Sequence, residues 1–267
     1  MKLNKRQIGK LGLYEFQGYI GAMTSPTFGG WRGTDRMIEL LSPYSFKGSK
    51  ILEAGCSTGY ITRYIGNKFD CEITGVDLSE LLVDIACARS DEQGLKNISF
   101  QQANVEELPF PEASFDLVYG QAITALVPDP LKALREYYRV LKPGGKVATL
   151  DLFRLENLSA EMIDETNEIM SKVIGAKVNI RTLEQWKQLF TAAGYDKINI
   201  QDYYDQLFVR DYSTSETLKI TFKTLWFMAV NKNIRSKLLP TLKFARKFQE
   251  SLKDHNYGYL IFIGEKN

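Results

Sequence analysis

The sequence predicts an α/β fold in which a Rossmann-like, seven-stranded, mainly parallel sheet carries helices on both faces. Between residues 50 and 153, short apolar runs alternate with stretches of helical periodicity, which is typical of βαβ units. The first apolar run enters a glycine-rich turn at 53–59 that opens a helix, as a βαβ unit begins. Two more strand patterns follow at 197–203 and 257–264. The helical block between them is too long for a hairpin loop, so we expect it to cap one end of the sheet.

The N-terminal part, residues 1–45, is predicted to be a helical segment that includes a Gly-Gly flap. Apolar side chains recur loosely along its first half: Ile8, Leu11, Leu13, Phe16 and Tyr19. The flap, residues 27–33, contains Gly30 and is either a turn that starts a helix or a loop that folds over a ligand. Thr34 or Asp35 can cap the following helix, because short polar side chains accept the free N–H groups of a first turn.

The central part, residues 46–205, is predicted to form a Rossmann-like domain that binds a ligand. Its strands are predicted from short β-prone runs at 51–52, 71–76, 98–101, 115–119, 146–150 and 197–203. Ser79, Asp129 with Pro130, and Thr182 are expected to begin three of its helices. Residues 154–181 fall outside the strand pattern and are interpreted as a helical lid element. Right-handed crossovers place the ligand of such a sheet at the carboxyl ends of its strands.

The C-terminal part is predicted to be a helical cap at 206–256 and a final strand at 257–267 that returns to the sheet. Aromatic residues are frequent around the cap: Tyr203, Tyr204, Phe208, Tyr212, Phe222, Trp226, Phe227 and Phe244. They indicate either a pocket for an apolar or aromatic molecule or the buried core of the cap itself. Residues 232–253 combine an apolar stripe with seven basic residues. This pattern favours a solvated helix face over a patch for a membrane surface or an acidic ligand.

Composition argues against several classes of protein. The 267 residues are 44% apolar and carry a net charge of +2, which gives no reason to expect a nucleic acid partner. No apolar run is long enough to span a membrane and none follows the basic start, so we expect a cytoplasmic protein without integral membrane association. Cys56, Cys71 and Cys87 are expected to be reduced and buried. With His255 as the one histidine, we expect neither a metal site nor a histidine-based hydrolase.

The turn at 53–59 reads Glu-Ala-Gly-Cys-Ser-Thr-Gly and separates three kinds of cofactor site. A P-loop needs Lys after its last glycine, where this chain has Tyr60. A dinucleotide fingerprint needs glycines at its first, third and sixth positions, which here are Gly55, Ser57 and Tyr60. The remaining interpretation is a nucleoside-bearing cofactor without a pyrophosphate. Asp77 ends the second strand, where a carboxylate can accept hydrogen bonds from both ribose hydroxyls or, alternatively, start a helix as a turn residue.

Several short motifs follow one another in a consistent order and spacing. They are the turn at 53–59, Val76-Asp77-Leu78-Ser79, the runs 104–110 and 114–118, Val127-Pro128-Asp129-Pro130, and 139–145. Together they resemble the motifs of class I S-adenosylmethionine-dependent methyltransferases, in particular the ubiquinone/menaquinone-type (methyltransferase type 11) subgroup. The resemblance covers about residues 30–153 and, more weakly, the last two strands.

The resemblance implies S-adenosylmethionine as cofactor and S-adenosylhomocysteine as product. It implies that Glu53, Gly55 and the backbone around Cys56 hold the methionine end of the cofactor, within the loop that Gly59 closes. Asp77 would accept the hydrogen bonds of the ribose hydroxyls.

Five further residues complete the cofactor site that the resemblance implies. Leu78 would pack on the adenine ring. Asn104 stands where the family often has Asp near the adenine amino group, and its amide oxygen can accept the same hydrogen bond. The N–H of Val105 would meet a ring nitrogen, and Gln121 would lie near the methionine portion. Gly30 joins the site through the flap.

The chain departs from the family pattern at two places. Ser57 replaces the middle glycine of the first motif, and Ala125-Leu126 stands where relatives often carry two histidines, so an acid/base role of those histidines is absent. Methyl transfer needs an in-line approach by the nucleophile, for which positioning and desolvation can supply most of the rate. The catalytic residues are left open. A base, if one is needed, would come from Tyr14, Tyr19, Tyr119, Asp151 or His255.

The expected function is S-adenosylmethionine-dependent methyl transfer to a small, apolar or aromatic molecule by a monomer or homodimer. One alternative is a non-catalytic subunit that binds the cofactor. An RNA or protein methyltransferase is a weaker alternative. Residues 120–123, Gly-Gln-Ala-Ile, stand where methyltransferases of base amines usually have an Asn/Asp-Pro-Pro-aromatic motif.

Overall fold

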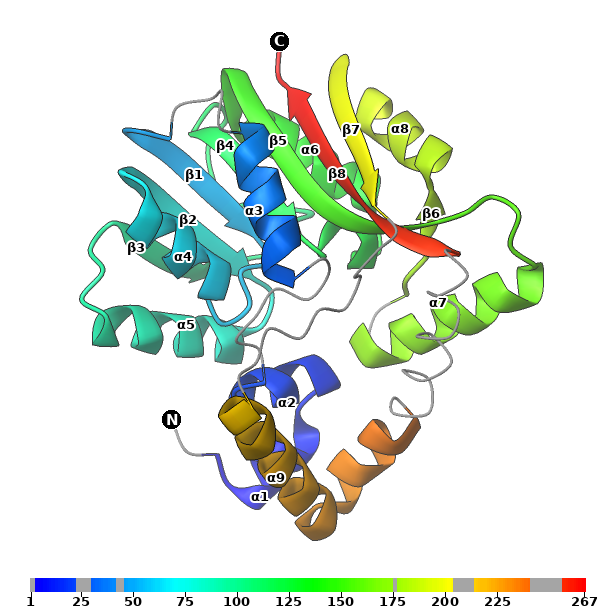
Figure 1. Cartoon of the computed structure of the whole chain (residues 1–267). Coiled ribbons are helices and arrows are strands. Elements are labelled where there is room, and N and C mark those ends of the chain that lie inside the picture. The colour runs from blue at the N-terminus through cyan, green and yellow to red at the C-terminus, as the bar shows by residue number, and fades with distance from the viewer. Residues whose placement is uncertain (1–2, 23–29, 42–45, 175–176, 204–213, 241–255) are drawn as a thin grey trace.

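The computed structural model describes residues 3–22, 30–41, 46–174, 177–203, 214–240 and 256–267, and these carry one large sheet flanked by helices (Figure 1). The sheet has the strand order β3-β2-β1-β4-β5-β8-β7. The strands are β1 (Ser49–Ala54), β2 (Cys71–Asp77), β3 (Ile98–Gln102), β4 (Phe115–Gln121), β5 (Leu141–Arg154), β7 (Lys197–Tyr203) and β8 (Tyr257–Glu265). Only β8 is antiparallel to its neighbours among these strands. The predicted seven-stranded, mainly parallel sheet is therefore confirmed.

The sequence does not predict one short strand. The strand β6 (Arg181–Thr182) is hydrogen-bonded to the end of β5, and a strand of two residues leaves no alternating pattern in the sequence.

The order of the strands indicates where a ligand can bind. The chain runs from β1 to β2 on one side and later to β4 on the other side of β1. The strand order reverses at β1, and the crevice at the carboxyl ends of β1 and β4 is where such sheets bind ligands.

Helices cover both faces of the sheet, as the sequence predicts (Figure 1). One face carries α3 (Gly30–Leu41), α4 (Tyr60–Lys68) and α5 (Glu80–Glu92), and the other carries α6 (Pro130–Val140) and α8 (Leu183–Ala192). Alternate strand residues serve the two faces: Ile51 packs toward α3 and α4, whereas Leu52 packs toward α6. The helix α7 (Ala160–Ile174) falls within the segment 154–181, and its Thr166 hydroxyl accepts a hydrogen bond from Tyr257 at 2.8 Å.

Of the four predicted helix starts, Ser79, Asp129 and Thr182 stand at the N-cap positions of α5, α6 and α8, and the predicted start of α3 is wrong. Asp129 accepts the Lys132 N–H at 3.0 Å ahead of Pro130, and Thr182 forms a capping box with α8. In contrast, α3 already begins at Gly30, so Thr34 and Asp35 lie inside the helix and cap nothing. Their side chains form hydrogen bonds with residues of other elements, Thr34 with Gln121 and Asp35 with Tyr64. A prediction from local pattern cannot include such long-range partners.

The N-terminal helices and the insertion after β7 pack together on one side of the sheet (Figure 1). The helices α1 (Lys5–Lys10), α2 (Leu13–Ile20) and α9 (Thr214–Val230) share an apolar cluster with helical residues 232–240. The rings of Phe16 and Phe227 meet edge to face with centroids 5.4 Å apart. The sequence analysis predicts an N-terminal segment and a cap as two separate parts, without a contact between them. The boundaries it places at 45, 205 and 256 fall on or beside residues outside the described ranges, so they stay predictions.

Candidate functional site

The glycine loop between β1 and α4 is a compact turn with three residues in the left-handed region. Gly55, Ser57 and Gly59 have φ angles of 71°, 51° and 68°. The Cys56 N–H donates to the Val76 carbonyl at 2.8 Å, which ties the loop to the end of β2. Ser57 is uncommon at such an angle because its Cβ crowds the backbone. The backbone, rather than side chains, therefore shapes this end of the site.

Two predicted glycines have packing constraints of their own. A Cβ on Gly55 would come within 2.8 Å of the Ile123 side chain, so that Ile123 covers this part of the loop. A Cβ on Gly59 would come within 2.5 Å of Phe100 and 2.9 Å of Ala86. Gly59 thus lets α4 pack closely on β3 and α5. Gly30 is the first residue of α3, while the flap residues 27–29 lie outside the described ranges.

Asp77 sits at the carboxyl end of β2 and connects two turns of the site. Its Oδ2 accepts the Ser57 N–H at 2.9 Å, and its Oδ1 accepts the Ser79 N–H at 3.0 Å. Burial raises the pKa of the carboxyl, while the backbone N–H groups act in the opposite direction. Each carboxylate oxygen has a second lone pair for a ligand donor. The structure therefore brings Asp77 and the glycine loop together, as the sequence predicts.

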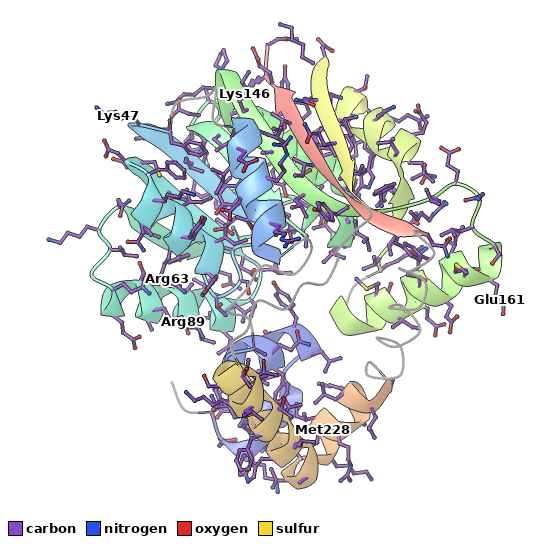
Figure 2. The ribbon with its side chains drawn as sticks, in the orientation of Figure 1. Lys47, Arg63, Arg89, Lys146, Glu161 and Met228 are labelled. Carbon is purple, nitrogen blue, oxygen red and sulfur yellow. The ribbon has the colours of Figure 1, made fainter. Side chains whose placement is uncertain are left out.

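The Glu53 carboxylate is buried in a low-dielectric environment beneath the glycine loop. Burial raises the pKa of its carboxyl from an ordinary 4.5 to about 7, although the Thr62 hydroxyl donates a hydrogen bond to Oε2. The buried Tyr119 hydroxyl lies beside this carboxyl, and burial together with the Glu53 charge raises the pKa of that hydroxyl. Arg63, labelled in Figure 2, instead donates to the Thr58 carbonyl at 2.8 Å. Glu53 therefore lacks a direct cationic partner among the described side chains.

The groups expected at the adenine line the other side of Asp77. The Leu78 side chain is 69% exposed, so its apolar surface is open to a flat ring. The Asn104 amide oxygen already accepts the Glu106 N–H at 3.0 Å, so a ligand would have to use its second lone pair. The Val105 N–H has no hydrogen-bond partner within the part of the chain that the structure describes.

Gln121, the last residue of β4, is buried and fixed by a neighbour that sequence reasoning missed. Its Oε1 accepts the Thr34 hydroxyl at 2.8 Å, which links the end of β4 to α3. The chain then turns through Ala122, whose φ of 57° is again left-handed, before Ile123 folds back over Gly55. This turn places the β4 carboxyl end beside the glycine loop.

The helix α2 packs over the glycine loop and the start of α5, and no motif in the sequence predicts this contact. Tyr14 lies against Ser57 and Asp77, and burial, with the Asp77 charge, raises the pKa of its hydroxyl. Ser79 stands at the N-cap position of α5 as predicted, but Glu15 accepts its hydroxyl at 2.8 Å, so the hydroxyl bonds to α2 rather than to the first turn of α5. Gly18 packs directly against Leu82 of α5 and leaves no room for a larger side chain.

Two of the remaining base candidates, Tyr19 and Asp151, already take part in structural contacts. Tyr19 accepts the Leu3 N–H at 3.2 Å and packs against Phe227 in the apolar cluster of the cap. Asp151 is fully buried, accepts the Ala125 N–H at 2.9 Å, and has its pKa raised by burial to about 6. Asp151 thereby holds the turn after β4 in place. His255 lies outside the described residues.

Neither thiols nor metal ligands gather in the described residues. Cys56 and Cys71 are buried and Cys87 is half-buried, all three as free thiols. Across the described ranges no group of three His, Cys, Asp or Glu side chains could hold a metal ion. No helix among these residues is long and apolar enough to span a bilayer.

Comparison with known proteins identifies the family. The family described as "Methyltransferase domain" matches residues 52–149, which include the glycine loop, Asp77 and β4. An uncharacterized protein of Haemophilus influenzae is 33% identical over 174 residues, or 64% of this chain and 67% of that protein. The chain belongs to the class I S-adenosylmethionine-dependent methyltransferases.

Other members of the family match over shorter lengths. The uncharacterized methyltransferase YcgJ of Bacillus subtilis is 30% identical over 144 residues, which are 54% of this chain and 55% of YcgJ. The aligned part thus spans about half to two thirds of these curated relatives.

Solved structures share the fold of this family member at low identity. Phosphoethanolamine N-methyltransferase 2 of Haemonchus contortus, in complex with phosphomonomethylethanolamine and S-adenosylhomocysteine, gives a TM-score of 0.73 at 20% identity. The match covers 95% of this chain and 57% of that chain. The 4+2 cyclase SpnF gives a TM-score of 0.72 at 19% identity, covering 98% of this chain and 96% of that chain.

Proposed function

We propose that the chain transfers a methyl group from S-adenosylmethionine to a small molecule. The observation that carries the proposal is the position of Asp77, held between the Ser57 and Ser79 N–H groups at the carboxyl end of β2. A carboxylate at this place, beside a glycine loop without a third glycine, suits a ribose that carries no pyrophosphate.

Three further observations support the fit of this cofactor. Glu53 is a buried carboxylate without a direct cationic partner among the described side chains, and the amino-acid end of the cofactor carries an ammonium. Leu78 leaves an apolar face exposed for the adenine, and the Val105 N–H is free to donate to a ring nitrogen. The Cys56 backbone, Gly55 and Gln121 would surround the methionine portion.

The chain's own residues position the reactants and exclude water. The cofactor supplies an electrophilic methyl group on sulfur, which an in-line nucleophile can attack. Positioning by the glycine loop and the turn after β4, with α2 as a cover, would supply most of the rate. Tyr14 stays protonated near neutral pH because its pKa is raised, so it would donate a hydrogen bond rather than accept a proton.

The acceptor is proposed to be small and apolar or aromatic, taken up by a monomer or homodimer. The described cap aromatics do not decide this, because Phe222 and Trp226 face solvent and Phe227 packs inside the cap. The Haemonchus contortus structure holds a phosphorylated amine. A panel of acceptors should therefore contain both apolar aromatic compounds and polar amines.

Binding of S-adenosylhomocysteine to Asp77→Ala tests the cofactor site. We expect the affinity to fall by about 100-fold or more, because two charge-assisted hydrogen bonds to the ribose are lost. Asp84→Ala is a matched control, since Asp84 is an exposed carboxylate on α5 away from the loop. Equal affinity of Asp77→Ala and the native chain by calorimetry, with both folded, would refute the ribose assignment.

Turnover separates the enzyme from a non-catalytic binder. The 4+2 cyclase SpnF shares this fold, and one fold can serve proteins with different reactions. Product formation from S-adenosylmethionine with any acceptor in the panel supports the transferase. Tight binding of the cofactor without turnover on any acceptor would support the regulatory or partner subunit instead.

A further inference from the structure

The helix α9 presents large apolar side chains on two opposite faces. Its inner face packs Ile220, Phe227 and Met228 against the N-terminal helices, and Met228 is labelled in Figure 2. Its outer face leaves four side chains mostly in solvent: Leu218 at 65% exposed, Phe222 at 72%, Leu225 at 59% and Trp226 at 52%. A helix that is apolar all round is normally covered on all sides.

The four exposed residues form one continuous stripe. Positions i, i+4, i+7 and i+8 lie on the same face of an α-helix. Side chains of this size rarely gather in solvent on one helix unless the patch contacts something. We call Leu218, Phe222, Leu225 and Trp226 the outer stripe of α9.

Basic residues accompany the outer stripe along the chain. Residues 214–240 contain five basic residues and a single acidic one, while the whole chain has a net charge of only +2. Lys219 follows the first stripe residue on α9, and Lys232 and Arg235 lie exposed on the next helical stretch. Lys223 and Lys237 instead donate to the carbonyls of Ile20 and Leu11, and so hold the cap together.

We propose that the outer stripe docks on an anionic phospholipid surface. Tryptophan and phenylalanine favour the boundary between headgroups and acyl chains, and basic side chains beside them pair with lipid phosphates. The helix would lie in the plane of the surface, since no helix among the described residues can span a bilayer.

Charge disfavours the other occupants of the stripe. A contact between two copies through this patch would bring like charges together, because each copy carries five basic residues against one acidic residue over 214–240. The segment 241–255 carries four basic residues and two acidic ones, so it too has the wrong sign to neutralise the patch. An anionic surface complements both the apolar and the basic parts.

Vesicle co-sedimentation of the full chain tests the proposal. Vesicles of phosphatidylcholine mixed with phosphatidylglycerol should bind the chain at low salt, and vesicles of phosphatidylcholine alone should bind it at least about tenfold more weakly. Raising the salt should release the chain, because exposed charges are screened. Binding to neither vesicle, or equal binding to both, would overturn the proposal.

Two double variants separate the apolar and the basic contributions. Phe222→Ser with Trp226→Ser, and Lys232→Glu with Arg235→Glu, should each lower binding to the anionic vesicles by about tenfold or more. Lys96→Glu with Lys132→Glu makes the same change in net charge at exposed sites on other elements, and it should bind within about twofold of the native chain. Loss of binding in this control would mean that net charge alone acts, which contradicts a specific surface.

Two more readouts distinguish the outcomes. All variants should unfold cooperatively and keep the native affinity for S-adenosylhomocysteine, because none of the substituted residues belongs to the glycine loop; Trp226 is the one whose ring also contacts the cap cluster, edge to face with Phe227 at 4.8 Å between centroids. Sedimentation equilibrium should show the same oligomeric state for the native chain and for Phe222→Ser with Trp226→Ser. A native dimer that this variant dissociates would assign the stripe to a second copy and refute the lipid surface.

Discussion

The buried carboxyl of Glu53 makes the affinity for the cofactor depend on pH. In the free protein its pKa is raised by burial to about 7, so at about pH 6 most molecules hold a neutral carboxyl. The cofactor's ammonium requires the ionised form, and removing the proton at one pH unit below the pKa costs about 1.4 kcal/mol. We therefore expect S-adenosylhomocysteine to bind about tenfold more weakly at about pH 6 than at about pH 8.

Without a bound cation, Glu53 also makes the stability of the folded chain depend on pH. Its pKa is higher in the folded chain than the ordinary 4.5, so the free energy of unfolding is highest below about pH 4.5 and falls as the pH rises through 7. The difference corresponds to about 3 kcal/mol at about pH 8. Glu53→Gln keeps an acceptor for the Thr62 hydroxyl and removes the charge. It should raise the free energy of unfolding at this pH and weaken cofactor binding at the same time.

Calorimetry across this pH range, with denaturant unfolding of the cofactor-free chain, measures both effects. The native chain should release close to one proton on binding at about pH 6, because bound cation lowers the pKa of Glu53. Glu53→Gln should bind weakly at both pH values and show no such release. Affinity of the native chain that stays flat with pH, or a Gln variant that keeps the full pH dependence, would refute the reasoning.

Three further variants probe the supports of the site. Glu15→Ala loses the hydrogen bond to Ser79 that holds α2 over the loop. It should weaken S-adenosylhomocysteine binding by about threefold to tenfold in calorimetry, and an unchanged affinity would contradict this role of Glu15. Gly59→Ala should lower the free energy of unfolding by about 1–3 kcal/mol, because its φ is 68° and a Cβ would meet Phe100 at 2.5 Å; a variant as stable as the native chain would contradict this close packing. Asp151→Asn should raise the free energy of unfolding by about 1–3 kcal/mol at about pH 8. Burial raises the pKa of Asp151 to about 6, so the native chain loses stability as the pH rises through that value and the variant does not. The gain should shrink toward about pH 4, and a gain that does not change with pH would exclude this cause.

Local patterns in the sequence predict most of the sheet and several of its helix starts. Asp129 with Pro130 and Thr182 act as expected because the groups that they satisfy lie within three residues. The glycine loop and Asp77 were also predictable, since strand ends and turn residues place them at one edge of the sheet. The cofactor roles of the individual side chains remain predictions.

The cover of the site could not be predicted from the sequence. The Glu15 carboxylate and the Ser79 hydroxyl are 64 residues apart, and the Thr34 hydroxyl and the Gln121 amide oxygen are 87 residues apart. Contacts of this kind depend on how whole elements pack, so the sequence places Ser79 correctly at the start of α5 but does not show that its hydroxyl bonds to α2. The start of α3 was wrong for the same reason.

The cap also constrains the order in which the molecule can assemble. Lys223 bonds to the Ile20 carbonyl and Lys237 to the Leu11 carbonyl, across separations of 203 and 226 residues. The ribosome makes the N-terminal part of the chain first, so the contacts of α1 and α2 with α9 and residues 232–240 must wait for segments synthesised far later. Contacts this distant in sequence close slowly. The strands β1 to β5 and the glycine loop are therefore synthesised before the cap cluster can close, whereas β8, which lies between β5 and β7, joins the sheet only after α9 has been made.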